Sequence, residues 1–279
     1  MTDFDHTLTK AYCADGSTAD TSFKAIIDYR KTPKEVQEEC GALYRKYFPM
    51  ERNPNLPLEE KISAMQDWWV GDLEQFSSAG FDRADFAIMG IEGKLFFRKG
   101  TRNLLETCHD NKIDFVVMSA GIYEYVESSM QILTHSHESG YSEKLANEFN
   151  QTIISNRFNY ELSDDKSKSL FERAEVVGYK LPLVTPMTKR DTIYSDDGPV
   201  RVKKNVVVVG DIVEDAHMAK SRKHDTILKV GMMIDAKKES HRETQLASFR
   251  DTFDLIIAHD GSFCPLVDTM QVICGKSVK

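Results

Sequence analysis

The apolar positions of this chain follow two successive patterns, and the first is purely helical. Between residues 33 and 97 apolar side chains recur every three or four positions, which predicts helices. Thr32-Pro33 followed by Glu35 is typical of a helix start, because it supplies a capping residue, a proline in the first turn and an acidic side chain. The first predicted helix carries apolar residues at Val36, Cys40, Leu43 and Tyr47.

A second helix is predicted to begin near Pro57, because prolines at 49, 54 and 57 interrupt the first pattern. Its apolar stripe consists of Ile62, Met65, Trp69, Leu73 and Phe76. Adjacent residues of a helix point about 100° apart, so Trp68 and Trp69 are expected to face different surroundings. One can pack inward while the other faces a cleft.

From residue 98 onward short apolar runs alternate with amphipathic segments. The predicted strands are 113–118, 153–154, 206–209, 226–230 and 255–258, and a closing helix spans 265–274. The four valines at 206–209 are typical of a strand covered on both faces. Such alternation predicts an α/β fold with a mostly parallel, Rossmann-like sheet and right-handed crossovers. Residues 1–15 and 98–279 then form the core, and 16–97 form an inserted helical cap.

Composition limits the class of protein further. The 279 residues are 41% hydrophobic, which is ordinary for a folded protein and sufficient for a core with a cap. A net charge of −8 argues against binding to a nucleic-acid backbone. The five cysteines are scattered, as in reduced cytosolic proteins, and no membrane segment or signal peptide is indicated. We therefore expect a cytoplasmic protein that binds neither nucleic acid nor membrane.

Asp3 and Asp5 form the first acidic pair, within Asp3-Phe4-Asp5-His6-Thr7. Alternate residues of an extended segment point to the same side. Two such carboxylates suit Mg²⁺, which prefers oxygen ligands and shares its coordination shell with a substrate phosphate. Asp3 could then attack phosphorus, while Asp5 protonates the leaving oxygen and later deprotonates water. The alternative is a pair of solvated aspartates at a frayed terminus.

A second acidic pair, Asp211 and Asp215, follows the valine run. One turn apart at the start of a helix, these residues share a face. They are either a second arm of the same metal site or acidic residues that interact favourably with the helix dipole. Ligands of open parallel sheets bind beyond the carboxyl ends of the strands, where Asp3, Ser119 and Asp211 are all predicted to lie. We therefore expect these three side chains to converge.

Ser119 and Lys189 are candidates for contacts with phosphate. Ser119-Ala120-Gly121 follows a predicted strand and precedes a helix, where a hydroxyl and exposed N–H groups either hold phosphate oxygens or cap the helix. Lys189 could offset negative charge in a transition state. A lysine beside Arg190 in a polar stretch is, however, also typical of a solvated surface.

Together these motifs resemble those of the haloacid dehalogenase superfamily. Within it, the chain is similar to the cytosolic 5′-nucleotidase III family, which includes pyrimidine and 7-methylguanosine phosphate-specific 5′-nucleotidases. The resemblance extends over nearly the whole chain and rests on residues 2–9, 46–54, 59–61, 65–69, 118–122, 154–156, 208–211 and 227–231. It implies a core of the haloacid dehalogenase type, a cap that selects the substrate, Mg²⁺ as cofactor, a nucleotide as substrate and a monomer.

The resemblance also implies roles for individual residues. The catalytic residues would be the nucleophile Asp3, the acid/base Asp5 and the lysine Lys189. The metal ligands would be Asp3, the backbone carbonyl of Asp5, and Asp211, with Asp215 close behind. The phosphate would contact Ser119, Ala120 and Lys189. The nucleobase would lie near Glu51, Trp69 and Asp72.

The two residues Glu51 and Trp69 carry the expectation about the base. A glutamate can accept hydrogen bonds from a base amino group, although a solvated loop glutamate is the alternative. An aromatic ring can stack on the base. Tryptophan rather than tyrosine resembles the 7-methylguanosine branch, because a cationic methylated guanine suits an indole face beside a carboxylate.

Some features differ from the family pattern, at His6, Asp72, Ile212 and Glu214. Only two residues precede Asp3, whereas the family's first strand precedes that aspartate, so we expect either residues upstream of Met1 or a less firmly held nucleophile. The leading hypothesis is Mg²⁺-dependent hydrolysis of a nucleoside 5′-monophosphate, pyrimidine or 7-methylguanosine, through an aspartyl-phosphate. The alternatives are a phosphatase of another small phosphomonoester and a nucleotide-binding pseudoenzyme.

Overall fold

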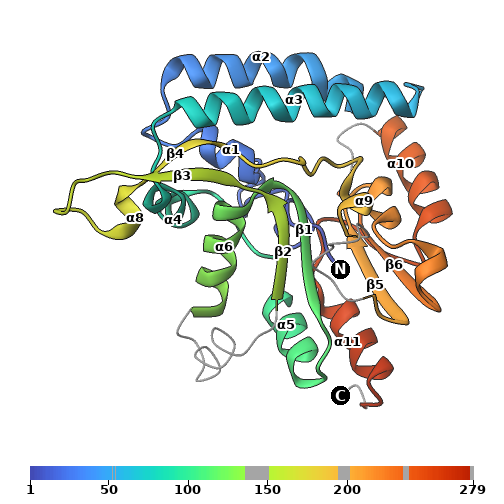
Figure 1. Ribbon diagram of the computed structural model, residues 1–279. Coiled ribbons are helices and arrows are strands. Elements are labelled where there is room, and N and C mark those ends of the chain that lie inside the picture. Colours follow the sequence, from blue (N-terminus) through green and yellow to red (C-terminus); the bar gives the residue numbers. More distant parts are fainter. Residues whose placement is uncertain (52, 54, 136–150, 194–201, 235–238, 277–279) are drawn as a thin grey trace.

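The computed structural model describes residues 1–51, 53, 55–135, 151–193, 202–234 and 239–276, so Arg52 and Pro54 of the resemblance lie outside the described residues. The helices are α1 (Ser22–Ile27), α2 (Lys34–Glu51), α3 (Leu58–Ser78), α4 (Arg83–Glu92), α5 (Thr101–Asp110), α6 (Tyr123–His135), α8 (Leu170–Arg173), α9 (Lys189–Ile193), α10 (Glu239–Thr252) and α11 (Cys264–Ile273), with 3₁₀ helices η1 (Val213–His217) and η2 (Ser221–Lys223). The strands are β1 (Phe115–Ile122), β2 (Gln151–Asn156), β3 (Phe158–Leu162), β4 (Ala174–Tyr179), β5 (Asn205–Gly210), β6 (Thr226–Met232) and β7 (Leu255–Ile257). The predicted α/β fold is confirmed (Figure 1).

A parallel sheet forms the centre of the molecule. β1 pairs with β2, and β6 pairs with both β5 and β7, always in parallel. Thr2 joins the two halves, because it forms parallel bridges to Val117 of β1 and to Val209 of β5. The Thr2 N–H donates to the Val116 carbonyl at 2.8 Å, and the Asp3 N–H donates to the Val209 carbonyl at 2.9 Å. The first residues thus act as a short central strand, and Asp3 emerges directly from it.

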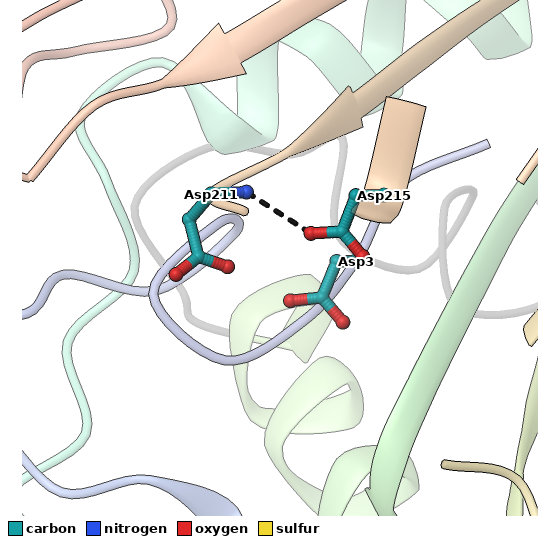
Figure 2. A group of neighbouring side chains, drawn as sticks. All are labelled: Asp3, Asp211 and Asp215. Carbon is teal, nitrogen blue, oxygen red and sulfur yellow. Dashed lines mark hydrogen bonds between the residues drawn. The ribbon is translucent and has the colours of Figure 1, made fainter. Parts of the chain in front are cut away.

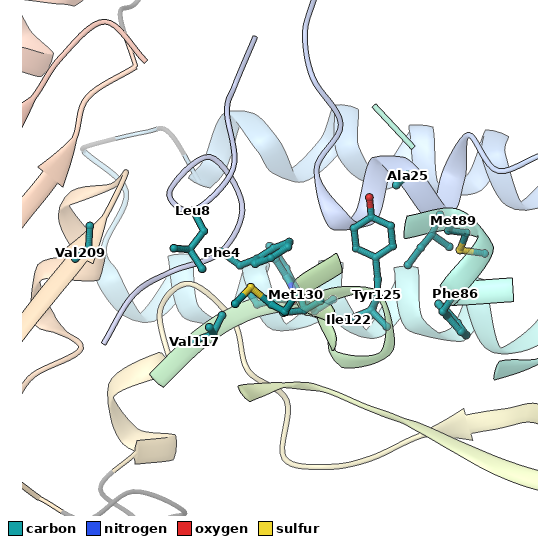
Figure 3. Close-up of a cluster of buried hydrophobic side chains, with 14 of the residues drawn as sticks. Phe4, Leu8, Ala25, Phe86, Met89, Val117, Ile122, Tyr125, Met130 and Val209 are labelled. Carbon is teal, nitrogen blue, oxygen red and sulfur yellow. The ribbon is translucent and has the colours of Figure 1, made fainter. Parts of the chain in front are cut away.

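The turn that follows Asp3 is anchored in the main apolar core. Phe4 and Leu8 are fully buried there, among side chains of β1, β5, α4 and α6 (Figure 3). Burial of side chains of this size contributes roughly 1.5–3 kcal/mol each. Phe4 and Leu8 therefore hold Asp5, which lies between them, and the preceding Asp3 in place.

Helices α2 and α3 lie side by side along one edge of the molecule (Figure 1). The buried residues of α3 include Met65, Trp69, Leu73 and Phe76, as the stripe predicted. α2 does not end at Pro49 but continues to Glu51. A proline in a helix costs one backbone hydrogen bond, and here the packing of α2 on α3 outweighs that cost.

Two strand predictions were incomplete. β1 does not end at Met118 but continues to Ile122, with a register irregularity in between, so Ser119, Ala120 and Gly121 belong to its last part. β3 and β4 form an antiparallel pair that was not predicted, because their residues show no clear alternation of apolar and polar positions. Few of the pair's side chains are buried, chiefly Phe158 and Val176, and short exposed strands carry little hydrophobic pattern.

Candidate active site

Three aspartates from distant parts of the chain meet at the carboxyl ends of the central strands. One carboxylate oxygen from each of Asp3, Asp211 and Asp215 lies within 4.8 Å of the others (Figure 2). Asp3 follows the central segment, and the other two follow β5. The predicted convergence of Asp3 with Asp211 is thus present in the structure. Oxygen donors at this spacing suit a hard divalent cation.

The backbone around Gly210 brings the second pair of aspartates together. A Cβ atom at Gly210 would lie 2.0 Å from the Cβ of Asp215, so only glycine permits this close approach. The carboxylate of Asp215 accepts hydrogen bonds from the N–H groups of Asp211 at 3.2 Å and of Ile212 at 3.3 Å. Asp215 lies in the 3₁₀ helix η1 rather than in an α-helix, and its carboxylate caps the turn that presents Asp211. Asp215 therefore combines a capping role with membership of the acidic group.

Lys189, the first residue of α9, is the cation of the site. Its Nζ lies 2.5 Å from Asp3 Oδ1 and 2.8 Å from Asp215 Oδ1, and all three side chains are buried. Burial raises the pKa of Asp3 and of Asp215 to about 6, although the charge of Lys189 opposes the shift. Burial alone would lower the pKa of Lys189, but the two carboxylates outweigh it and raise that pKa. The interpretation of Lys189 as a solvated surface residue was therefore wrong.

Asp5 points away from this group, toward α1. Its carboxylate accepts hydrogen bonds from the N–H of Ser22 at 2.7 Å and from the Ser22 hydroxyl at 2.5 Å. Burial raises the pKa of Asp5, and the bonds from Ser22 oppose the shift. The segment from Asp3 to Asp5 is not an extended strand, because a turn begins at Asp5. The expectation that alternation would place both carboxylates on one side did not allow for this turn.

Arg98 stabilises the turn at residues 5–8, although no sequence motif indicates this role. Its guanidinium donates to the backbone carbonyls of His6 and Thr7, the latter at 2.7 Å, and pairs with Asp260 at 2.8 Å. His6 has a φ of 60°, a left-handed conformation that leaves its carbonyl available to Arg98. Neither Arg98 nor Ser22 stands in a recognisable motif, so only the folded chain reveals them.

Ser119 and Ala120 lie in the last part of β1, directly after Met118, whose N–H donates to the Thr2 carbonyl. The Ser119 hydroxyl accepts a hydrogen bond from the Gly121 N–H at 2.9 Å. The Ala120 carbonyl accepts from Asn156 Nδ2 at 2.8 Å and from the indole Nε1 of Trp69 at 2.6 Å. A Cβ at Gly121 would lie 2.1 Å from the Ser22 hydroxyl, so this glycine lets β1 approach the serine that holds Asp5.

The three residues expected near the nucleobase have different surroundings. Trp69 faces the core, where it bonds Ala120 and packs edge-on against Phe23 with ring centroids 5.6 Å apart. Asp72 is buried within the helix pair, and burial raises its pKa to about 7, although hydrogen bonding, chiefly from Cys40, opposes the shift. Glu51 is the last residue of α2 and is partly exposed. Trp69 therefore contacts Ala120 in the last part of β1, whereas Asp72 lies within the helix pair.

A large apolar cavity lies away from these residues. It has a volume of about 650 Å³ and an apolar lining that includes Met1, Leu104, Val206 and Met270, at the opposite end of the central strands. The three aspartates of the acidic group are not part of this cavity. Chemistry, not cavity size, therefore identifies the candidate active site. No helix in the described ranges combines the length and apolar character that crossing a lipid bilayer requires.

The chain is similar in sequence to a family of known proteins. Residues 6–274 match the family model described as Pyrimidine 5′-nucleotidase (UMPH-1). The chain is 25% identical over 265 residues to the 7-methylguanosine phosphate-specific 5′-nucleotidase of Drosophila melanogaster, a match that covers 93% of this chain and 75% of the relative. It is 24% identical over 279 residues to the Homo sapiens protein of the same description, covering 99% of this chain and 82% of the relative.

A solved structure with a similar fold is that of cytosolic 5′-nucleotidase IIIB bound to cytidine. It superposes with a TM-score of 0.76 at 23% identity and covers 98% of this chain and 86% of the other. At that identity the similarity concerns the fold alone. The expected core of the haloacid dehalogenase type is confirmed.

Proposed function

The chain belongs to the pyrimidine 5′-nucleotidase family of hydrolases, and from this premise we propose that it hydrolyses nucleoside 5′-monophosphates to nucleoside and phosphate. The observation that carries the proposal is the buried group of Asp3, Asp211 and Asp215 around Lys189. An aspartate at the end of a central strand, next to a lysine and two further carboxylates, provides a nucleophile, a positive charge and metal ligands in one place.

The reaction proceeds through an aspartyl-phosphate. A carboxylate oxygen of Asp3 forms a bond to phosphorus, and the bond between phosphorus and the 5′-oxygen breaks. Asp5 donates a proton to the leaving oxygen, then takes one from the water that releases phosphate from Asp3. The raised pKa of Asp5 favours this role, because it brings the protonated form closer to neutral pH. Lys189 offsets the negative charge on Asp3 and on the transferred phosphoryl group.

The acidic group fits a bound Mg²⁺. We propose Asp3, Asp211 and the Asp5 backbone carbonyl as its ligands. The Asp215 oxygens already accept hydrogen bonds from Lys189 and from two backbone N–H groups. Asp215 would therefore orient Lys189 and the backbone of Asp211. The ion would neutralise phosphate oxygens and bring the phosphorus close to Asp3. Ser119, Ala120 and Lys189 would contact the remaining phosphate oxygens.

Residues 16–97 would form the cap that selects the base. Glu51 would accept hydrogen bonds from a base amino group, and Trp69 would stack on the ring once it leaves its contact with Ala120. Asp72 would act indirectly, because it is buried behind Trp68. The relatives named for 7-methylguanosine phosphate and the neighbour bound to cytidine support a pyrimidine or 7-methylguanosine nucleotide. A relative described as putative cytosolic 5′-nucleotidase 3 supports a cytoplasmic location, and we propose a monomer.

A phosphate-release assay tests the proposal. Purified protein is incubated with CMP, UMP, 7-methyl-GMP, a sugar phosphate and phosphoserine, each with Mg²⁺ and with EDTA. We expect release from at least one of the three nucleotides in Mg²⁺, and none in EDTA. Faster release from the sugar phosphate or phosphoserine would identify a different phosphomonoesterase. Nucleotide binding without any release, measured by calorimetry, would identify a pseudoenzyme.

A further inference from the structure

Helix α3 contacts the core at two points that lie on opposite sides of Asp3. Trp69 donates its indole N–H to the Ala120 carbonyl, at the end of β1. Closer to the start of α3, the Nζ of Lys61 lies 3.6 Å from Oε1 of Glu214, in the turn that follows β5. Because Thr2 and Asp3 lie between β1 and β5, the helix spans the acidic group from one side to the other.

The side chain of Lys61 is unusual for a lysine. The residue is only 8% exposed, and lysines are almost never buried without a partner. Among the residues that the structure describes, Glu214 is its ion-pair partner. Lys61, Met65 and Trp69 are spaced by four, so all three project from one stripe of α3 toward the core. The pair therefore sits at the covered face of the helix, unlike an ordinary surface ion pair.

The position of Glu214 ties this contact to the chemistry. Glu214 immediately precedes Asp215, which bonds Lys189 and the backbone of Asp211. A movement of α3 away from the core separates Lys61 from Glu214, and it opens the face of the acidic group that the helix covers.

We propose that the ion pair between Lys61 and Glu214 is a latch that positions α3 over the acidic group and holds the site closed while substrate is bound. This inference rests on the proposed function. A nucleotide enters when the latch and the contact between Trp69 and Ala120 part. The latch then re-forms behind the nucleotide, while Trp69 stacks on the base. The two charged groups are 3.6 Å apart and the Glu214 side chain is 28% exposed, so the pair is loose enough to part and re-form in every cycle. Lys61 and Glu214 are positioning residues that act through α3.

The two tryptophans allow the latch to be tested without any substrate. Both lie on α3 and the chain has no others, so acrylamide quenching of their fluorescence reports how well the core covers this helix. Measured in EDTA, Glu214→Gln and Lys61→Met should raise the quenching constant roughly twofold. Added salt should raise it in the wild type but not in the variants, because salt screens the pair. The charge-swapped double variant Lys61→Glu/Glu214→Lys should restore the wild-type value.

A matched control is Glu92→Gln, which removes the exposed ion pair between Glu92 and Arg30. It should leave quenching unchanged. Single variants with wild-type quenching, or a charge swap that fails to restore it, would overturn the proposal. Circular dichroism confirms that each variant is folded, and the conservative Glu214→Gln change keeps the side-chain volume should Lys61→Met unfold.

Kinetics then connect the latch to turnover. Glu214→Gln should raise KM for the nucleotide roughly two- to fivefold with a smaller change in kcat, as expected for loss of one modest interaction. The charge swap should return KM toward the wild-type value. If no variant hydrolyses any nucleotide but quenching follows the expected pattern, the latch stands and the proposed function fails. A lower kcat at unchanged KM would contradict the latch.

Discussion

The protein buries carboxyl groups in two regions with opposite surroundings. At the sheet, Asp3 and Asp215 lie against Lys189 and beside Asp211, among hydrogen-bond donors. In the helix pair, Asp72 lies against Cys40 and Trp68, and among the described residues it forms no ion pair with a cation. Burial raises the pKa in both regions, to about 6 at the sheet and about 7 in the helix pair.

The two regions differ in the partners that they offer to a charged carboxylate. The acidic group at the sheet keeps a lysine in contact and has further oxygens for a metal ion, so it stays charged and reactive. Asp72 has no such partner, and its Oδ1 lacks a hydrogen-bond partner among the described residues. A similar pKa shift therefore accompanies a cation-paired group that we propose to be catalytic in one region, and a stability cost in the other.

The largest expected effect separates the two regions by activity. Asp3→Asn should lower nucleotide hydrolysis by at least about 10³-fold, because an amide does not attack phosphorus. Asp72→Asn, the same chemical change at a buried site, should lower it less than about tenfold. Phosphate release by the two purified variants measures the contrast. Equal losses in both would remove the distinction on which the assignment of the nucleophile depends.

Removal of the Lys189 side-chain charge should have the second-largest effect, and it should lower stability. Lys189→Met leaves Asp3 and Asp215 buried without a cation, and breaking one side of a buried pair costs roughly 3–5 kcal/mol. Urea unfolding in EDTA measures the loss, and Mg²⁺ should recover part of it. Lys203→Met is the control, since its pair with Asp114 is partly exposed and should be worth about 1 kcal/mol or less. A Lys189 variant as stable as the control would contradict the electrostatic account.

Asp72 predicts a dependence of stability on pH. Its pKa in the folded protein, about 7, lies above its ordinary value of 3.8, so the folded state holds its proton over a range in which the unfolded state has lost it. The stability that this proton supports is present below pH 4 and is lost as the pH rises to 7, by up to about 4 kcal/mol.

Urea unfolding at pH 5 and pH 8 tests this expectation. Asp72→Asn should be more stable than the wild type at pH 8, and the advantage should shrink at pH 5. Asp3 and Asp215 titrate in the same direction, so only the difference between variant and wild type isolates Asp72. A constant difference between the two pH values would show that Asp72 is charged in both.

The smallest effect concerns the two adjacent tryptophans. Trp69 donates its indole N–H to the Ala120 carbonyl at 2.6 Å. The Nε1 of Trp68 is near Asp72 but makes no hydrogen bond of ordinary geometry to any described residue. Trp69→Phe should therefore cost about 1 kcal/mol more stability than Trp68→Phe, the typical net value of one hydrogen bond. Thermal unfolding of the matched pair measures it. A larger loss for Trp68→Phe would place the main anchor of α3 in the helix pair rather than on β1.

The sequence by itself determined the periodic elements and the chemistry they carry. The valine run, the helical stripe of α3 and the glycine before Asp211 are local features, and local physics decides them: side-chain burial, helix periodicity and the steric freedom of glycine. Asp3, Asp211 and Asp215 could be predicted as a group because the ends of parallel strands meet at one edge.

Only the tertiary structure decided which partners these residues have. That Asp5 turns to Ser22, that Arg98 holds the turn, and that Lys61 reaches Glu214 depend on contacts between elements 17 to 153 positions apart, for which a sequence carries no periodic signal. The same holds for Asp72, whose pKa follows from the helix packed against it. Burial and pairing are properties of the assembled core, so the charge state of a side chain is settled only there.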